Sequence, residues 1–105
     1  MVGLLQDKVA VVTGGSSGNG RAMAMAFAHE GADVVVADLQ AEPREGGTPT
    51  HELVMAETDR RAKFVRCDVT NVADLEAAVE EAEEFGGVDV MVNNAGIFRA
   101  EEFLD

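Results

Sequence analysis

Three glycines with the spacing Gly-x-x-x-Gly-x-Gly lie in the segment Thr13 to Gly20. A short apolar run precedes this segment and an alanine-rich run follows it, which predicts a turn between a strand and a helix. The free backbone N–H groups at the start of such a helix can hold a pyrophosphate without any lysine. Gly14 would permit the tight turn, Gly18 would let a phosphate approach, and Gly20 would allow close packing of the helix on the strand. A flexible turn is the alternative, and the flanking patterns disfavour it.

A carboxylate ends the next apolar run. Asp38 follows Asp33 to Ala37 and lies about 20 residues after Gly18, where it can accept hydrogen bonds from both hydroxyls of an adenosine ribose. A ribose 2′-phosphate would instead meet the carboxylate as a like charge, and the nearest cations that could oppose this are Arg21 and Arg44. We therefore expect NAD to be preferred over NADP as the cofactor.

Four short apolar runs alternate with three helical patterns. Strands are expected at Lys8 to Val12, Asp33 to Ala37, Lys63 to Cys67 and Val88 to Val92. A first helix is expected at Arg21 to Glu30, with Gly31 at its end, and a second at Pro49 to Arg61, capped by Thr48. A third helix, capped by Thr70 or Asn71, is expected over the apolar stripe Val72, Leu75, Val79, Ala82 and Phe85. Prolines and glycines make Leu39 to Thr50 a surface loop.

This βαβαβαβ order predicts an α/β fold, a doubly wound parallel sheet of Rossmann type with helices on both faces. The expected strand order is 3-2-1-4, and residues 1–105 form one dinucleotide-binding domain that ends after the fourth strand. In such a sheet the ligand lies at the carboxyl ends of the strands. The glycine turn, Asp38, Asp68 and the run Asn93 to Gly96 all follow strand ends, so they should meet at one edge.

Four motifs occur in order along the chain: Thr13 to Gly20, Asp38, Cys67-Asp68-Val69-Thr70 and Asn93-Asn94-Ala95-Gly96. Together they resemble the amino-terminal half of the short-chain dehydrogenase/reductase family. The resemblance implies an NAD(P)-binding half whose parent enzyme transfers hydride between NAD and an alcohol or ketone substrate. The expected cofactor-binding residues are Gly14, Ser16, Ser17, Gly18, Asn19, Gly20, Asp38, Leu39, Asp68, Val69, Asn94, Ala95 and Gly96.

The resemblance also implies individual roles. Asp68 would contact the adenine ring with Val69 beside it, Ser16 would bind phosphate or ribose, and Asn93 to Gly96 would stabilise the central sheet and line the cofactor cleft. Two positions depart from the family pattern: Asn19 replaces a common isoleucine, and the loop after Asp38 is longer and richer in proline and glycine than expected.

The family's proton-transfer group is a tyrosine, followed four residues later by a lysine and accompanied by a serine and an asparagine. The sequence contains no tyrosine, so no catalytic residue is assigned and the chain is expected to be inactive alone, as a truncated product or partial gene. A stand-alone, non-catalytic NAD-binding or regulatory module is the alternative, and a scaffold with a decayed site is a third. The substrate is not predicted, because its contacts come from the other half of the family fold.

The net charge is −12, from 20 acidic and 8 basic residues, which disfavours nucleic acid and anionic membranes as partners. No run approaches the ~18 apolar residues of a membrane span and the start lacks a secretion signal, so a cytoplasmic location is expected. The only cysteine is Cys67, which excludes an internal disulfide and a cysteine-cluster metal site.

The acidic excess also favours a salt-rich, halophilic cytoplasm, because the screening length falls to ~3 Å at molar salt. An ordinary acidic protein is the alternative. The fourth strand would leave unpaired N–H and C=O groups at the sheet edge, which predicts self-association through that strand.

Overall fold

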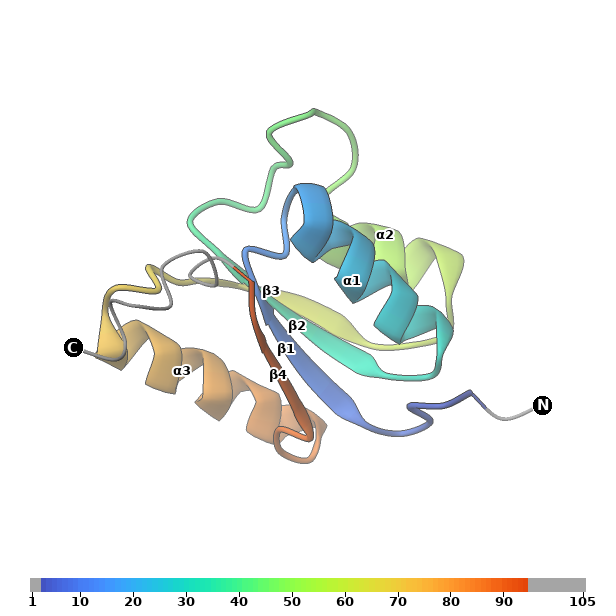
Figure 1. Cartoon of the computed structure of the whole chain (residues 1–105). Helices are drawn as coiled ribbons and strands as arrows, with labels where there is room; N and C mark the ends of the chain where they lie inside the picture. Colours follow the sequence, from blue (N-terminus) through green and yellow to red (C-terminus); the bar gives the residue numbers. More distant parts are fainter. Residues whose placement is uncertain (1–2, 95–105) are drawn as a thin grey trace.

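The computed structural model describes residues 3–94, which form a parallel sheet with helices on both faces (Figure 1). The strands are β1 (Val9–Thr13), β2 (Asp33–Asp38), β3 (Ala62–Arg66) and β4 (Val90–Asn93), in the order β3-β2-β1-β4. The helices are α1 (Gly18–His29), α2 (Thr50–Glu57) and α3 (Val72–Ala82), with a short 3₁₀ turn, η1 (Glu83–Phe85), after α3. The predicted fold class and strand order are confirmed.

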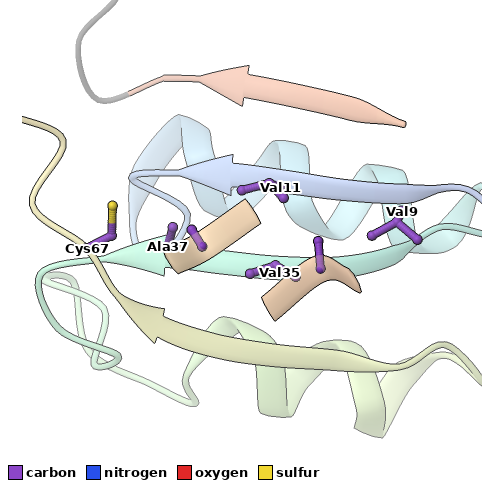
Figure 2. Close-up of a cluster of buried hydrophobic side chains, with 7 residues drawn as sticks. Val9, Val11, Val35, Ala37 and Cys67 are labelled. Atoms are coloured by element: carbon purple, nitrogen blue, oxygen red, sulfur yellow. The ribbon is translucent and has the colours of Figure 1, made fainter. Parts of the chain in front are cut away.

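One core lies between the sheet and α3. Val11 of β1 pairs with Val35 of β2, and these side chains pack with Ala78 and Ala82 of α3. Figure 2 shows Val11, Val35 and Ala37 on the strand surface that this core covers. The alanines let α3 approach the sheet closely, and each buried valine contributes about 1.5–3 kcal/mol relative to exposure.

A second core lies on the opposite face. The next residues along the two central strands, Val12 and Val36, are also paired and pack with Ala24 of α1 and Val54 of α2. Because successive side chains of a strand point to opposite faces, β1 and β2 are buried on both sides. This explains why both strands are continuous apolar runs in the sequence, and it holds the β1 and β2 ends rigidly.

The helix ends differ from the predicted ones. Helix α1 begins at Gly18 rather than Arg21, so the glycine run itself forms its first turn. Gly31 follows the helix with a φ of 103°, as predicted. Helix α2 has Pro49 as its N-cap, not Thr48, and it ends at Glu57 rather than Arg61. The backbone of Thr58 is extended, and its hydroxyl donates to the Val54 carbonyl, which stops the helix.

The third helix has one of the two predicted caps, and two residues of its apolar stripe are exposed. Asn71 is its N-cap, and the side chain accepts a hydrogen bond from the Asp74 N–H. Val72 is 68% exposed and Val79 is 38% exposed, because the helix instead presents its alanines to the sheet. These two valines of the apolar stripe therefore lie outside the core. No helix within residues 3–94 is long and apolar enough to cross a membrane.

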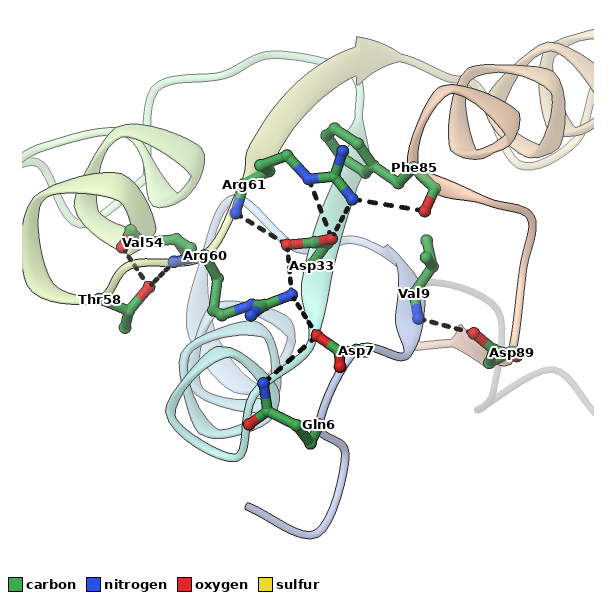
Figure 3. Close-up of polar contacts among 10 residues, drawn as sticks. All are labelled: Gln6, Asp7, Val9, Asp33, Val54, Thr58, Arg60, Arg61, Phe85 and Asp89. Carbon is green, nitrogen blue, oxygen red and sulfur yellow. Dashed lines mark hydrogen bonds and ion pairs between the residues drawn. The ribbon is translucent and has the colours of Figure 1, made fainter. Parts of the chain in front are cut away.

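A buried carboxylate joins β2 to the start of β3, at the end of the sheet opposite the glycine turn (Figure 3). Asp33 is 2% exposed. Its Oδ1 accepts a hydrogen bond from the Arg61 backbone N–H at 2.9 Å, and its Oδ2 accepts from Arg61 Nη2 at 2.6 Å. Arg60 Nη2 lies 3.1 Å from Oδ1 and also pairs with the exposed Asp7. Two cations therefore compensate one buried charge.

This environment changes the proton affinity of Asp33. Burial alone would raise the pKa, but hydrogen bonds from the Arg61 side chain and backbone, with the charges of Arg60 and Arg61, hold the pKa of Asp33 below its ordinary value of 3.8. Because the folded-state pKa is the lower one, the stabilisation is fully present above the unfolded-state pKa. It is lost as the pH falls through the folded-state pKa.

We predict that Asp33→Asn lowers the free energy of unfolding by about 3 kcal/mol at neutral pH, because it leaves two arginines without their buried counter-charge. Chemical denaturation followed by circular dichroism measures the change. The difference in the free energy of unfolding between the variant and the wild-type chain should shrink as the pH falls below 3.8, since the Asp33 carboxyl of the wild type is then progressively protonated.

Asp7→Asn is the matched control, because it removes an exposed carboxylate that contacts the same Arg60. Asparagine tolerates the positive φ of 63° at this position. Asp7→Asn should lower the free energy of unfolding by less than about 1 kcal/mol. Equal losses in the two variants would show that burial of the Asp33 pair does not contribute as argued.

Candidate functional site

A groove of about 600 Å³ opens at the carboxyl ends of β1, β2 and β4. Its lining includes eight of the predicted residues: Gly14, Ser16, Ser17, Gly18, Asn19, Asp38, Leu39 and Asn94. Gln40 and Arg44, which were not predicted as lining residues, complete it. The structure therefore brings together most of the predicted site at the edge where the strand order predicts a ligand.

The glycine turn has the geometry that its spacing predicts. Gly14 has a φ of 66°, and its N–H donates to the Ala37 carbonyl at 2.8 Å, which fixes the turn to the end of β2. A Cβ at Gly20 would overlap the Gly14 carbonyl, so only glycine lets α1 start against β1. Gly18 has a φ of 53°, and a Cβ there would meet open space. No other part of the described chain therefore packs against the side-chain position of Gly18.

Ser16 supplies a buried hydroxyl with no partner in the described part of the chain. The residue is 2% exposed, and its Oγ makes no hydrogen bond there. Buried polar groups are nearly always satisfied, and a ligand oxygen in the groove would satisfy this one. The donor set therefore fits a phosphate or a ribose, which is the role predicted for Ser16.

Asp38 is held at the groove by two backbone donors. Its Oδ1 accepts from the Leu39 N–H at 2.7 Å, and its Oδ2 accepts from the Ser16 N–H at 3.0 Å. Each carboxylate oxygen has a further lone pair, so the half-buried group can still accept from ligand hydroxyls. The Ser16 contact places this carboxylate directly beside the glycine turn.

The two arginines nearest in sequence to Asp38 and the turn have different positions. Arg44 lines the groove, so a cation does lie near the predicted ribose position. Arg21 instead donates from Nη1 to the Thr50 hydroxyl at 3.1 Å. Of these two arginines, only Arg44 therefore lines the groove.

Besides Gly20, the predicted residues Asp68 and Val69 lie away from the groove lining. The carboxylate of Asp68 accepts from the Thr70 hydroxyl at 2.6 Å and from the Thr70 N–H at 2.9 Å, and these bonds lower the pKa of Asp68. Val69 packs against the core under α3. Their contact with an adenine ring stays a prediction.

The segment after β4 is described only in part. The Thr13 hydroxyl lies 3.2 Å from Asn93 Oδ1, so Asn93 links β4 to β1, and Asn94 lines the groove. Ala95 and Gly96 lie outside the described residues. Within residues 3–94, no group of three or more His, Cys, Asp or Glu side chains could hold a metal ion.

The connection between β2 and α2 contains a contact that the sequence did not reveal. Glu45 Oε2 accepts a hydrogen bond from the Gly18 N–H at 3.1 Å, and the Arg44 N–H donates to the Ser17 hydroxyl at 2.8 Å. Both depend on the path of a long loop, and no residue pattern within the loop specifies that path.

The sequence is similar to those of known dehydrogenases. The short chain dehydrogenase family model matches residues 8–105. L-2,3-butanediol dehydrogenase of Corynebacterium glutamicum is 44% identical over 100 residues, which cover 94% of this chain and 38% of that protein. Galactitol 2-dehydrogenase of Agrobacterium fabrum is 42% identical over 95 residues, which cover 90% and 34%.

The fold comparison agrees with the sequence comparison. A crystal structure of a short chain dehydrogenase from Mycobacterium smegmatis matches with a TM-score of 0.76 and 35% identity, covering 92% of this chain and 41% of that one. The chain thus spans about two fifths of the length of these proteins or slightly less.

We predict that Gly20→Ala destabilises the fold by about 3 kcal/mol, because the added methyl group overlaps the Gly14 carbonyl and must push α1 away from β1. Chemical denaturation measures the loss. Asn19→Ala is the control: it changes the exposed neighbour and should alter stability by less than about 0.5 kcal/mol. A stable Gly20→Ala chain would contradict the close approach of helix and strand.

Proposed function

The chain belongs to the short chain dehydrogenase family, and on this premise we propose that it is the dinucleotide-binding part of an oxidoreductase. The observation that carries the proposal is the Ser16 N–H to Asp38 contact, because it puts a carboxylate that can accept from hydroxyls beside the N-terminus of α1. A dinucleotide carries a diphosphate next to a ribose, and this pair of features complements both.

Different residues would hold different parts of such a cofactor. The backbone donors at the start of α1 would bind the diphosphate, with the buried Ser16 hydroxyl beside them. Asp38 would accept from the ribose hydroxyls, and Asn94 would close the side of the groove next to β4. When bound, the nicotinamide ring supplies the carbon that accepts or gives up hydride.

NAD is the form of the cofactor that we propose. A 2′-phosphate would lie against the Asp38 carboxylate, and like charges at this range repel. The groove-lining Arg44 is the feature that opposes the preference, but its exposed side chain is well screened by water. Asp38 is fixed by two backbone donors, so the carboxylate cannot turn away without losing both.

The parent reaction that we propose is hydride transfer between NAD and an alcohol or ketone. The names of the two curated relatives, a butanediol and a galactitol dehydrogenase, support this substrate class. The 105 residues contain no tyrosine, so the part of the reaction we assign to them is cofactor binding.

A non-catalytic NAD-binding module is the second candidate, since residues 3–94 already form a groove at the glycine turn. A reading frame that continues into a Tyr-x-x-x-Lys sequence supports the enzyme.

The surface suggests further properties. We propose a salt-rich cytoplasm as the environment, and neither nucleic acid nor membrane as a partner, because the net charge is −12. We also propose self-association through β4, which in the described residues pairs only with β1 and carries Met91 with 44% of its surface exposed.

We predict that the chain binds NAD more tightly than NADP, and that Asp38→Asn weakens NAD binding about tenfold while reducing the preference over NADP. The amide is a weaker acceptor for the ribose hydroxyls and no longer repels a 2′-phosphate. Isothermal titration calorimetry measures both affinities. Glu76→Gln removes one charge from the exposed surface of α3 and should bind both cofactors as the wild type does. An unchanged NAD affinity in Asp38→Asn would contradict the ribose assignment.

We predict that the chain is dimeric or larger at ~1 M salt, where the repulsion between acidic copies is screened, and that Met91→Lys makes it monomeric. Light scattering after size-exclusion chromatography measures the mass. Met55→Lys is the control, because Met55 is similarly exposed (49%) but lies on α2. The thermal midpoint of the wild type should rise with salt. A monomer at all salt concentrations would contradict association through β4.

A further inference from the structure

A carboxylate of the protein lies where the helix would receive an anion. Glu45 belongs to the connection between β2 and α2, residues 39–49, and its Oε2 accepts from the N–H of Gly18 at 3.1 Å. Gly18 is the first residue of α1, so this N–H has no partner within the helix. In Figure 1 the connection passes beside the N-terminal end of α1.

The surroundings of Glu45 favour its charged form. The Gly18 N–H is the largest influence that lowers the pKa of Glu45, and the Ser17 side chain and the charge of Arg21 act in the same direction. The groups that attract this carboxylate are those that would attract a phosphate. The start of α1 therefore favours a negative charge, and in the free protein the Glu45 carboxylate supplies it.

The connection is fixed on both sides of Glu45. The Arg44 N–H donates to the Ser17 hydroxyl at 2.8 Å. At the start of α2, the buried Thr50 hydroxyl donates to the Gly15 carbonyl at 2.8 Å. These two contacts tie the connection to the glycine turn, and they hold the Glu45 carboxylate close to the start of α1.

Glu45 itself can leave without disturbing the core. Its side chain is exposed, and it is followed by Gly46 and Gly47, which have φ values of 85° and 103°. A Cβ at either glycine would meet nothing within 4 Å. The segment next to the carboxylate is therefore unpacked, and displacing the carboxylate requires only its polar contacts with Gly18 and Ser17 to break.

We propose that Glu45 is an internal competitor for the phosphate of the cofactor: its carboxylate occupies the Gly18 N–H in the free protein and must be displaced when the diphosphate binds. This inference rests on the proposed dinucleotide binding. Two anions cannot share one N–H donor, and their mutual repulsion at contact distance opposes simultaneous binding. The competition lowers cofactor affinity and keeps the helix end satisfied in the free protein.

The test compares Glu45→Gln with Glu42→Gln by calorimetry, using NAD, ADP and adenosine as ligands. Glu42 is an exposed residue of the same connection, so its variant makes the same change in net charge without touching Gly18. Glu45→Gln should bind NAD and ADP about three- to tenfold more tightly than the wild type. Adenosine has no phosphate and should bind both variants and the wild type equally.

A second measurement examines the free protein. In ¹⁵N-labelled protein without ligand, the amide resonance of Gly18 should shift in Glu45→Gln and stay in place in Glu42→Gln. An unshifted Gly18 resonance in Glu45→Gln would overturn the proposed contact, whatever the affinities are.

The remaining outcomes separate the competition from the proposed function. If Glu45→Gln and the wild type bind NAD equally, or if Glu45→Gln binds more weakly, the competition is wrong and dinucleotide binding stands. A gain for adenosine equal to the gain for NAD would also overturn it, because the effect would not arise at the phosphate. If neither protein binds NAD or ADP at low or molar salt, the proposed function fails and the competition with it.

Discussion

The site depends on how closely the first turn of α1 approaches the end of β1. At Gly20 there is no room for a side chain beside the Gly14 carbonyl, whereas at Gly18 the side-chain position faces open space and the N–H binds Glu45. The same turn thus packs tightly on its inner side and is accessible on its outer side. Because β1 is buried on both faces of the sheet, the turn starts from a well-packed strand, and this packing sets where the N–H groups at the start of the helix lie.

Two carboxylates of β2 show how the surroundings assign a role to the same chemical group. Asp33, at the start of the strand, is buried and paired with Arg60 and Arg61, so its hydrogen-bonding capacity serves the fold. Asp38, at the other end, is held by the backbone N–H groups of Ser16 and Leu39 and keeps acceptor capacity toward the groove. One end of the strand therefore stabilises the sheet, and the other remains able to bind.

The sequence predicts the strands, their order and the groove better than it predicts the loop above the groove. Short β-branched apolar runs such as residues 34–37 are typical of a strand buried on both faces, and the spacing of Gly14, Gly18 and Gly20 favours a tight turn before a helix. The sequence does not predict that α2 ends at Glu57, because the extended backbone of Thr58 and the hydrogen bond from its hydroxyl to the Val54 carbonyl leave no signal in the residue pattern. The position of Glu45 was missed because it depends on tertiary contacts of the loop with α1, for which local spacing carries no signal.

The contact between Glu45 and Gly18 links the stability of the free protein to its affinity for an anion. A helix N-terminus at a groove needs partners for its N–H groups in every state, whether water, a ligand or a side chain. In a chain with a net charge of −12, an added carboxylate is costly on most of the surface, but here the Gly18 N–H and the charge of Arg21 attract it. A ligand that replaces Glu45 must first break this contact, so the free energy that the contact contributes to the free protein is subtracted from the free energy of ligand binding. A stronger contact between Glu45 and Gly18 therefore implies a lower affinity for the ligand.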